Sequence, residues 1–198
     1  MSTGPAKATK ERTSRTSGAA RQRVLDAALE LFGEQGISGT SLQMIADRIG
    51  VTKAAVYHQF QSKEEIVKGV LAPALETLRE SVEHAERHET VEARREAMLT
   101  ALVELSVGHR WLAAILQGDP AVNAMVRGHT DHDLGPRIMA LLVGPSPDVR
   151  AAMAGSMVGG AMLIVCTAPE LQQYDDEELS QNLLELARDL LSRHAGKG

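Results

Sequence analysis

The side chains best suited to chemistry in this chain are a lysine, a tyrosine and a histidine that follow closely on one another, Lys53, Tyr57 and His58. An ammonium group, a phenol hydroxyl and an imidazole all form hydrogen bonds with phosphate oxygens or with the edges of bases. Ala54 lies beside them, and its small side chain lets the backbone approach base edges and thymine methyl groups closely. This combination predicts contacts with double-stranded DNA.

A short helix must hold these side chains on one outward face, and the stretch Thr40–Lys63 is typical of two helices joined by a glycine turn. Ser41 and Thr52 are good N-caps, because a hydroxyl accepts a hydrogen bond from a free backbone N–H of the first turn. Gly50 lies where the chain must turn, and glycine adopts a positive φ without a steric penalty. The inward faces are apolar, with Leu42, Ile45, Ala46 and Ile49 on the first helix and Val56 and Phe60 on the second.

The order of caps, glycine turn and polar outward face predicts a helix-turn-helix that reads DNA. The alternative is an ordinary helical hairpin in an all-α core, for which the polar face has no use. The residues that we expect to contact DNA are Ser41, Gln43, Thr52, Lys53, Ala54, Tyr57, His58 and Lys63.

The string IADRIGVTKAAVYHQFQSKEE, residues 45–65, resembles the DNA-binding signature of the TetR family of bacterial transcriptional repressors. The preceding string RVLDAALELFGEQGISGTS is similar to the first helix of that family, so the resemblance covers about residues 21–68. It implies an all-α protein with a DNA-binding head and a larger body that dimerises. It also implies a repressor that leaves its operator when a small-molecule effector enters the body.

The net charge of −5 argues against a nucleic-acid partner when the chain is taken as a whole. Residues 1–68 carry ten Lys and Arg against seven Asp and Glu, whereas residues 69–198 carry eleven against nineteen. The resulting charges of +3 and −8 fit a positive DNA-binding head joined to an acidic body that faces away from DNA. A chance fluctuation of charge is the alternative.

Three regions follow from these patterns: a disordered basic arm over residues 1–20, the DNA-binding domain over 21–68, and an effector-binding and dimerisation domain over 69–198. The arm is small, polar and basic, and without an apolar core it is not a secretory signal. Its cations, Lys7, Lys10, Arg12 and Arg15, either contact phosphates or only keep the chain soluble.

The apolar spacing predicts a first helix from about Arg21 to Gln35, ended by Gly36. A fourth helix begins after Ser62, with Glu65 in capping-box position, and runs to about His84; Pro73 kinks or splits it. The body shows no strand pattern, and its helices are expected near residues 91–107, 110–117, 119–127, 134–143, 147–167 and 176–194.

Residues 151–168 carry no charge. This segment of eighteen residues is just long enough to be considered as a membrane span. Ala, Gly, Ser and Met dominate this segment, so its transfer into lipid would be poor. We expect instead a helix buried on all sides, in which Gly155, Gly159 and Gly160 admit another helix closely.

The last helix carries leucines at alternating four- and three-residue steps, which form a seam. Two such helices from each of two chains would make a four-helix bundle at a dimer interface, as the resemblance implies; packing within one chain is the alternative. The expected interface residues are Met153, Met157, Gly160, Leu179, Leu183, Leu186 and Leu190.

The middle helices are suited to a small-molecule pocket, because six of the eight methionines lie after residue 90 and methionine adapts to varied ligands. Such pockets combine apolar walls with a few polar anchors, and ordinary core packing is the alternative. The predicted lining is Met98, Leu102, Leu105, His109, Trp111, Ile115, Gln117, Asn123 and Met139.

The side chains able to bind a metal gather at His129, Asp131, His132 and Asp133, but neighbours in one turn seldom converge on one ion. A solvated loop is expected there, with no metal and no cofactor. The sequence has no nucleotide-binding glycine loop and no nucleophile elbow, so an enzyme is not expected. The single cysteine, Cys166, excludes an internal disulfide and fits the reducing cytoplasm.

Together these features predict an all-α, homodimeric regulator that binds a double-stranded DNA operator and an unknown small-molecule effector, with no membrane contact. Two alternatives remain: an activator or DNA binder that needs no effector, and a helical small-molecule or metal-binding protein without operator function.

Overall fold

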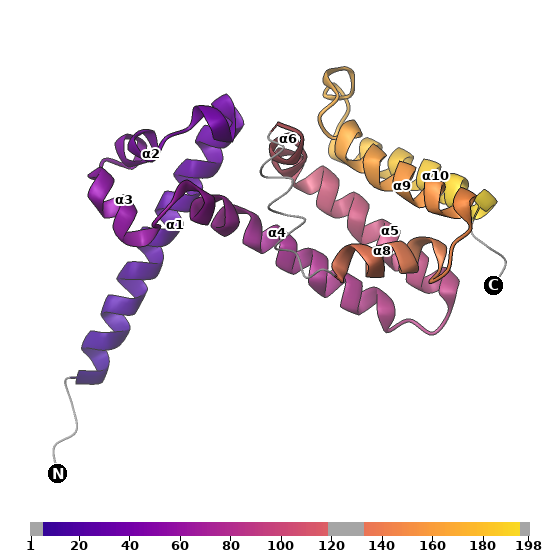
Figure 1. Ribbon diagram of the computed structural model, residues 1–198, viewed down its shortest axis with the longest axis horizontal. Helices are drawn as coiled ribbons and strands as arrows, with labels where there is room; N and C mark the ends of the chain where they lie inside the picture. Colours follow the sequence, from indigo (N-terminus) through magenta and orange to yellow (C-terminus); the bar gives the residue numbers. More distant parts are fainter. Residues whose placement is uncertain (1–5, 119–132, 195–198) are drawn as a thin grey trace, which may run out of the picture. The chain divides into compact units, whose positions relative to one another are not determined.

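The computed structural model describes residues 6–118 and 133–194, and within them the side chains of 18–115 and 133–193. Over these residues every regular element is helical, with nine α-helices and one short 3-10 turn (Figure 1). The predicted all-α class is therefore confirmed. Contacts divide the chain into two compact units, Met1–Ala72, here called the head, and Pro73–Gly198, here called the body.

The first helix, α1 (Ala6–Gly39), begins earlier than predicted. From Ala6 to Ser17 the sequence holds neither glycine nor proline, and most of its residues tolerate a helix well. Helix α1 therefore extends from Ala6 through the segment for which the sequence predicts a disordered arm, residues 1–20. Gly36 interrupts α1 with φ 75° and ψ 166°, as the predicted end at this glycine requires, and one further turn follows.

The head is completed by α2 (Leu42–Ile49), α3 (Lys53–Gln59) and the first turns of α4 (Lys63–Glu86). Helices α1, α2 and α3 pack pairwise against one another (Figure 1). Their apolar faces meet in one core, made of Val24, Ala27, Ala28, Leu31, Phe32, Ile37, Ile45, Ala46, Val56, Phe60, Ile66, Val67, Val70 and Leu71. This core orients the outward face of α3.

Helix α4 passes from the head into the body without a break. Ser62 caps it, because its hydroxyl accepts the N–H of Glu65 at 3.2 Å. The Glu65 carboxylate accepts the N–H of Gln61 at 2.8 Å, one residue before the partner that a regular capping box uses. Pro73 lies inside the helix and does not split it; the boundary between the two units falls directly before it.

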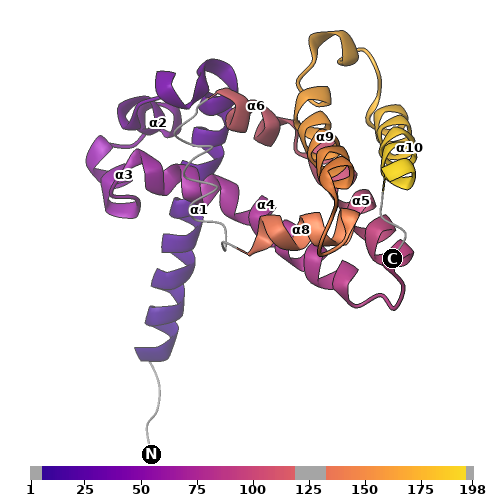
Figure 2. The ribbon, with the colours of Figure 1, turned by 45° about the vertical axis from the view of Figure 1, so that its right-hand side comes forward.

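The body consists of the rest of α4 with α5 (Val91–Gly108), α6 (Arg110–Gly118), α8 (Leu134–Val143), α9 (Val149–Val165) and α10 (Asp176–His194). These bounds agree closely with the predicted helices, and the helix predicted at 119–127 lies outside the described residues. Helix α10 packs along α5 and α9, and α8 packs on α5 and α9 (Figures 1 and 2). Among the described helices, none is long and apolar enough to cross a membrane.

Charged side chains also join the helices of the body. Arg137 of α8 donates two hydrogen bonds to the carboxylate of Glu86 at the end of α4, at 2.9 and 2.7 Å. This pairing lowers the pKa of Glu86. Arg188 of α10 binds Glu96 of α5 in the same two-pronged way, and the pKa of Glu96 is lowered for the same reason.

Candidate nucleic-acid interface

Two helix caps and a glycine turn shape the two-helix unit of α2 and α3. Ser41 Oγ accepts the N–H of Met44 at 3.2 Å, and Thr52 Oγ1 accepts the N–H of Ala55 at 3.2 Å. Gly50 has φ 68° and ψ 38°, the left-handed conformation that only glycine adopts without strain. The two caps and the turn are thus as the sequence predicts, and α3 packs against α2 across this turn.

Helix α3 has one buried and one exposed face. Val56 and the following Phe60 are completely buried at 0% exposure. Lys53 and Ala54 are exposed, and so is His58. Tyr57 is 46% exposed, and the Lys53 ammonium lies 5.7 Å from the centroid of its ring. The outward face therefore offers a cation, a phenol and an imidazole beside small side chains, a set that can bind phosphates and base edges.

The other predicted contacts on α2 and its cap are also exposed. Ser41 keeps its hydroxyl oxygen engaged in the cap, so that its remaining hydrogen-bonding capacity points to solvent. The Gln43 amide donates to the Asp47 carboxylate at 2.7 Å along α2. Gln43 would have to release or share this bond to reach DNA.

Lys63 has a different environment from the one predicted. Its ammonium donates to the carbonyl of Ile37 at 2.9 Å and to that of Thr40 at 3.2 Å, and the side chain is half-buried. These carbonyls lie where α1 ends, and a helix C-terminus favours a cation. Lys63 thus binds the end of α1, a role that sequence spacing did not distinguish from a phosphate contact.

Three arginines that the sequence analysis did not single out also connect the head. Arg21 and Arg23 of α1 donate to backbone carbonyls at the ends of α3 and α2. Arg48 of α2 binds Glu30 at 2.9 Å and Glu34 at 2.7 Å on α1, and its hydrogen bond lowers the pKa of Glu34. The sequence shows these cations but not which carbonyl or carboxylate each one meets.

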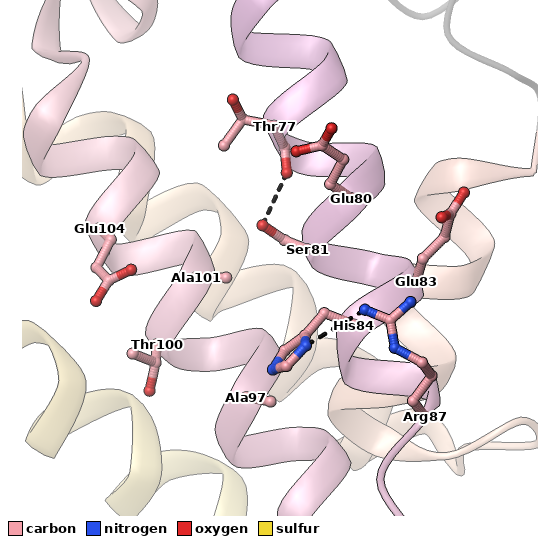
Figure 3. Close-up of a pocket in the computed structure, with 10 residues that line it drawn as sticks. All are labelled: Thr77, Glu80, Ser81, Glu83, His84, Arg87, Ala97, Thr100, Ala101 and Glu104. Carbon is pink, nitrogen blue, oxygen red and sulfur yellow. Dashed lines mark hydrogen bonds between the residues drawn. The ribbon is translucent and has the colours of Figure 1, made fainter.

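In the body, a groove of about 660 Å³ runs between α4 and α5. Figure 3 shows polar side chains lining it, with Ser81 Oγ bonded to the carbonyl of Thr77 at 2.8 Å and Arg87 3.4 Å from His84 Nδ1. The complete lining is Thr77, Glu80, Ser81, Glu83, His84, Arg87, Ala97, Thr100, Ala101 and Glu104. None of the nine predicted pocket residues belongs to it.

The predicted pocket residues lie elsewhere in the body. Met98 and Ile115 are buried among other helices at 0% and 6% exposure. Five others are half-buried, namely Leu102, Leu105, His109, Trp111 and Met139. The Gln117 side chain and Asn123 lie outside the described residues. His109 Nδ1 is buried without a hydrogen-bond partner in the described part of the chain, and its ring lies 6.0 Å from that of Trp111.

The predicted leucine seam of α10 is wrong in its register. Leu179 and Leu183 are buried inside their own chain at 8% and 7% exposure, and Leu190 is half-buried against the same core. Only Leu186 is fully outward. The inward stripe is formed by Leu179, Leu183, Ala187 and Leu191, because four-residue steps keep side chains on one helix face.

The prediction that α9 is buried on all sides is wrong. One face of the helix is an exposed apolar stripe. Its members are Val149, Met153, Met157 and Ile164, each more than half exposed, and Gly160 lies in the same row. Gly155 is the one of the three glycines that packs closely: a Cβ there would lie 2.6 Å from Met139 Sδ of α8. Around Gly159 and Gly160 the space is open within this chain.

Candidate metal ligands do not converge in the described residues, where no three His, Cys, Asp or Glu side chains form a group. His129, Asp131 and His132 lie outside those residues. His84 lies near the end of α4 and His88 lies just beyond it, and their rings stack edge to face with centroids 5.2 Å apart. Cys166 is buried, and burial raises the pKa of its thiol, as expected of a small apolar core residue.

Comparison with known proteins gives matches to the head at the level of sequence. Residues 24–70 match the family model described as "Bacterial regulatory proteins, tetR family". A stretch of 52 residues is 52% identical to the transcriptional regulator SrpR of Pseudomonas putida, covering 26% of this chain and 24% of that protein. Another of 46 residues is 50% identical to AcrR of Shigella flexneri, covering 23% and 21%. The chain thus spans about a quarter of the length of these relatives.

Solved structures match both units. The TetR family transcriptional regulator PfmR of Thermus thermophilus is similar with a TM-score of 0.63 and 25% identity, covering 83% of this chain and 96% of that one. KstR2 of Mycobacterium tuberculosis, a ketosteroid transcriptional regulator, has a TM-score of 0.67 and 17% identity over 89% and 95%. FadR of Bacillus subtilis, solved with stearoyl-CoA, has a TM-score of 0.63 and 20% identity over 84% and 96%.

Proposed function

Since the chain belongs to the tetR family of bacterial regulatory proteins, we propose that it is a homodimeric repressor of transcription that binds a palindromic DNA operator. The observation that carries the proposal is α3, whose exposed face presents Lys53, Tyr57 and His58 while Val56 and Phe60 anchor it in the core. The family consists of regulators, in accord with the expected absence of enzymatic activity.

The dimer is part of the proposal because a palindrome has two half-sites, about one DNA turn or 34–36 Å apart, and each chain has one α3. The outward stripe of α9 with Leu186 of α10 supplies an apolar surface that a second copy would cover. Large exposed apolar patches on a folded chain mark interaction sites. A twofold pairing of these helices would make the four-helix bundle that the resemblance implies.

Effector binding is proposed for the body. The groove between α4 and α5 falls in the usual size range of small-molecule sites, about 300–1,000 Å³, and its lining would suit an effector with hydrogen-bonding groups. Because α4 continues from the body into the head, a ligand held against it acts on an element of both units. The effector must favour one of two conformations, and it shifts their balance only by its differential affinity.

Selection of genomic fragments by the full-length protein, followed by a gel shift at several salt concentrations, tests this function. Enrichment of one palindromic sequence is the expected result. Binding without sequence preference would favour an effector-independent DNA binder, and no binding at low salt would favour a helical ligand-binding protein. Release of the enriched duplex by a small molecule in a screen then identifies the effector.

A further inference from the structure

Two arginines of α1 each donate a hydrogen bond to the last carbonyl of another helix of the head. Arg21 Nη1 lies 3.2 Å from the carbonyl oxygen of Gln59, the last residue of α3. Arg23 Nη2 lies 3.1 Å from that of Ile49, the last residue of α2. The last carbonyls of a helix have no partner within it and carry partial negative charge, so a cation satisfies both their hydrogen-bonding and their electrostatic needs.

Arg21 is also held from a second direction. Its Cζ lies 4.0 Å from the centroid of the Phe60 ring, an arrangement in which the ring attracts a cation. Phe60 is completely buried and ends α3 through its N–H, which donates to the carbonyl of Val56. The guanidinium is therefore placed by the core of the head as well as by the carbonyl.

Helix α3 is short, seven residues from Lys53 to Gln59, so its direction depends strongly on how its two ends are held. Thr52 holds the first end through its cap, and Arg21 holds the last end from α1. Removal of the second attachment leaves Val56 buried but lets the outward side chains shift. Misplacement of a binding group by about 1 Å lowers its contribution greatly.

We propose that Arg21 is a positioning residue for DNA recognition, which sets the direction of α3 without itself touching DNA. This inference rests on the proposed function and adds a specificity-determining residue that lies outside the two-helix unit. Arg23 makes the corresponding hydrogen bond at the end of α2.

The test compares Arg21→Met with Lys68→Met in the full-length protein. Lys68 is an exposed cation of the head that acts on Glu64 through its charge and makes no hydrogen bond in the described part of the chain, so its replacement makes the same change of charge. The probes are the duplex that the wild-type protein enriches from a randomised library and a scrambled duplex of the same composition. Affinity for each is measured over a series of salt concentrations, below the melting temperature of every variant.

Arg21→Met is expected to bind the enriched duplex about tenfold more weakly, the effect of one hydrogen bond to a charged group. Its affinity for the scrambled duplex and the salt dependence of its binding should stay at the wild-type values. Arg21→Lys should recover most of the specificity, since an ammonium can also donate to the Gln59 carbonyl over the ring. Lys68→Met should leave the ratio of the two affinities unchanged.

A specificity ratio equal to that of the wild type in Arg21→Met would overturn the inference. So would a salt slope that falls by about 0.9, because Arg21 would then contact a phosphate directly. If Arg21→Met fails to fold, Arg21→Lys decides, and loss of its specificity at normal stability would contradict the role of the cation. Failure of the wild-type protein to enrich any duplex would refute the proposed function itself.

Discussion

Leu183 and Leu186 lie three residues apart on α10, yet Leu183 is 7% exposed and Leu186 is 68% exposed. Leu183 belongs to the core of its own chain, whereas Leu186 is an exposed apolar side chain on a helix that packs against α9. Substitutions at these two positions can therefore test the stability of one chain separately from the proposed association of two chains.

Leu186→Glu should abolish the proposed dimer and leave the fold of each chain intact. The side chain lies in solvent in a single chain, so a carboxylate costs nothing there, whereas each carboxylate buried without a partner costs the dimer about 2 kcal/mol or more. Sedimentation at micromolar concentration detects the dimer, and a gel shift on the enriched duplex detects specific DNA binding. The dimer and the specific binding should be lost together.

Leu183→Glu is the matched control, since it places the same carboxylate in the core and should unfold the body. If the wild-type chain sediments as a monomer, the dimer model fails. A Leu186→Glu protein that stays dimeric and binds DNA normally would move the interface to another surface.

Tyr57→Phe removes one hydroxyl from the exposed face of α3 and almost no volume. Binding to the enriched duplex should weaken by about 1 kcal/mol, a typical net hydrogen bond, with no change in melting temperature. Val56→Ala, one residue away and completely buried, should do the opposite: stability falls by about 2 kcal/mol. A large loss of stability in Tyr57→Phe with unchanged binding would contradict the orientation of α3.

Deletion of residues 1–18 should leave the head folded, because among the α1 side chains that the structure describes, from Gly18 onward, the first buried one is Val24. If the basic residues of this segment bind phosphates, the salt dependence of DNA binding flattens by about 0.9 log unit for each phosphate that the shortened protein no longer neutralises. Replacing Lys7, Lys10, Arg12 and Arg15 together by glutamine keeps the segment and removes its charge. An unchanged salt slope in both variants would mean that the segment does not bind DNA.

The Glu34–Arg48 pair predicts a pH dependence of the α1–α2 contact. The hydrogen bond from Arg48 lowers the pKa of Glu34 below its usual 4.5, so the pair stabilises the head above that pH and ceases to do so as the pH falls through the lowered value. Amide hydrogen exchange in α2 should therefore be slower in the wild type than in Arg48→Met at neutral pH. The difference should vanish in acid, and a difference that persists there would exclude Glu34 as its source.

Two glycine-to-alanine substitutions should change the stability of the protein in opposite directions. A Cβ on Gly69 of α4 would lie 2.7 Å from Leu25 Cδ2 and 3.3 Å from Phe60 Cε1, so Gly69→Ala should destabilise the head by about 1–3 kcal/mol. Gly33 of α1 is exposed with open space around it, and Gly33→Ala should stabilise by about 0.5–1 kcal/mol. Thermal unfolding of both variants measures these changes in stability. Stabilisation by Gly69→Ala would show that Leu25 moves aside freely.

Most bounds of the helices could be predicted from the sequence because their signals are local; the start of α1 at Ala6 is the exception. Ser41, Thr52 and Ser62 cap helices by bonds to residues three positions away, and Gly50 turns the chain by its own φ. The inward and outward faces of α3 could also be predicted from the sequence. Val56 and Tyr57 are neighbours in a regular helix, so their side chains point in different directions. Such signals need only the chain neighbours, which the sequence shows.

Only the tertiary structure decided which partner each outward or inward side chain has. Lys63 and Lys53 both lie at the start of a helix. Lys63 donates to a carbonyl at the end of α1, whereas Lys53 is exposed to solvent. The heptad spacing of α10 allowed four leucines to share one face, and the packing of α5 and α9 against it selected a different stripe. Which side chains are buried or paired depends on residues distant in the chain, because it is decided by how the helices pack. The helices themselves form from interactions among residues close in the sequence.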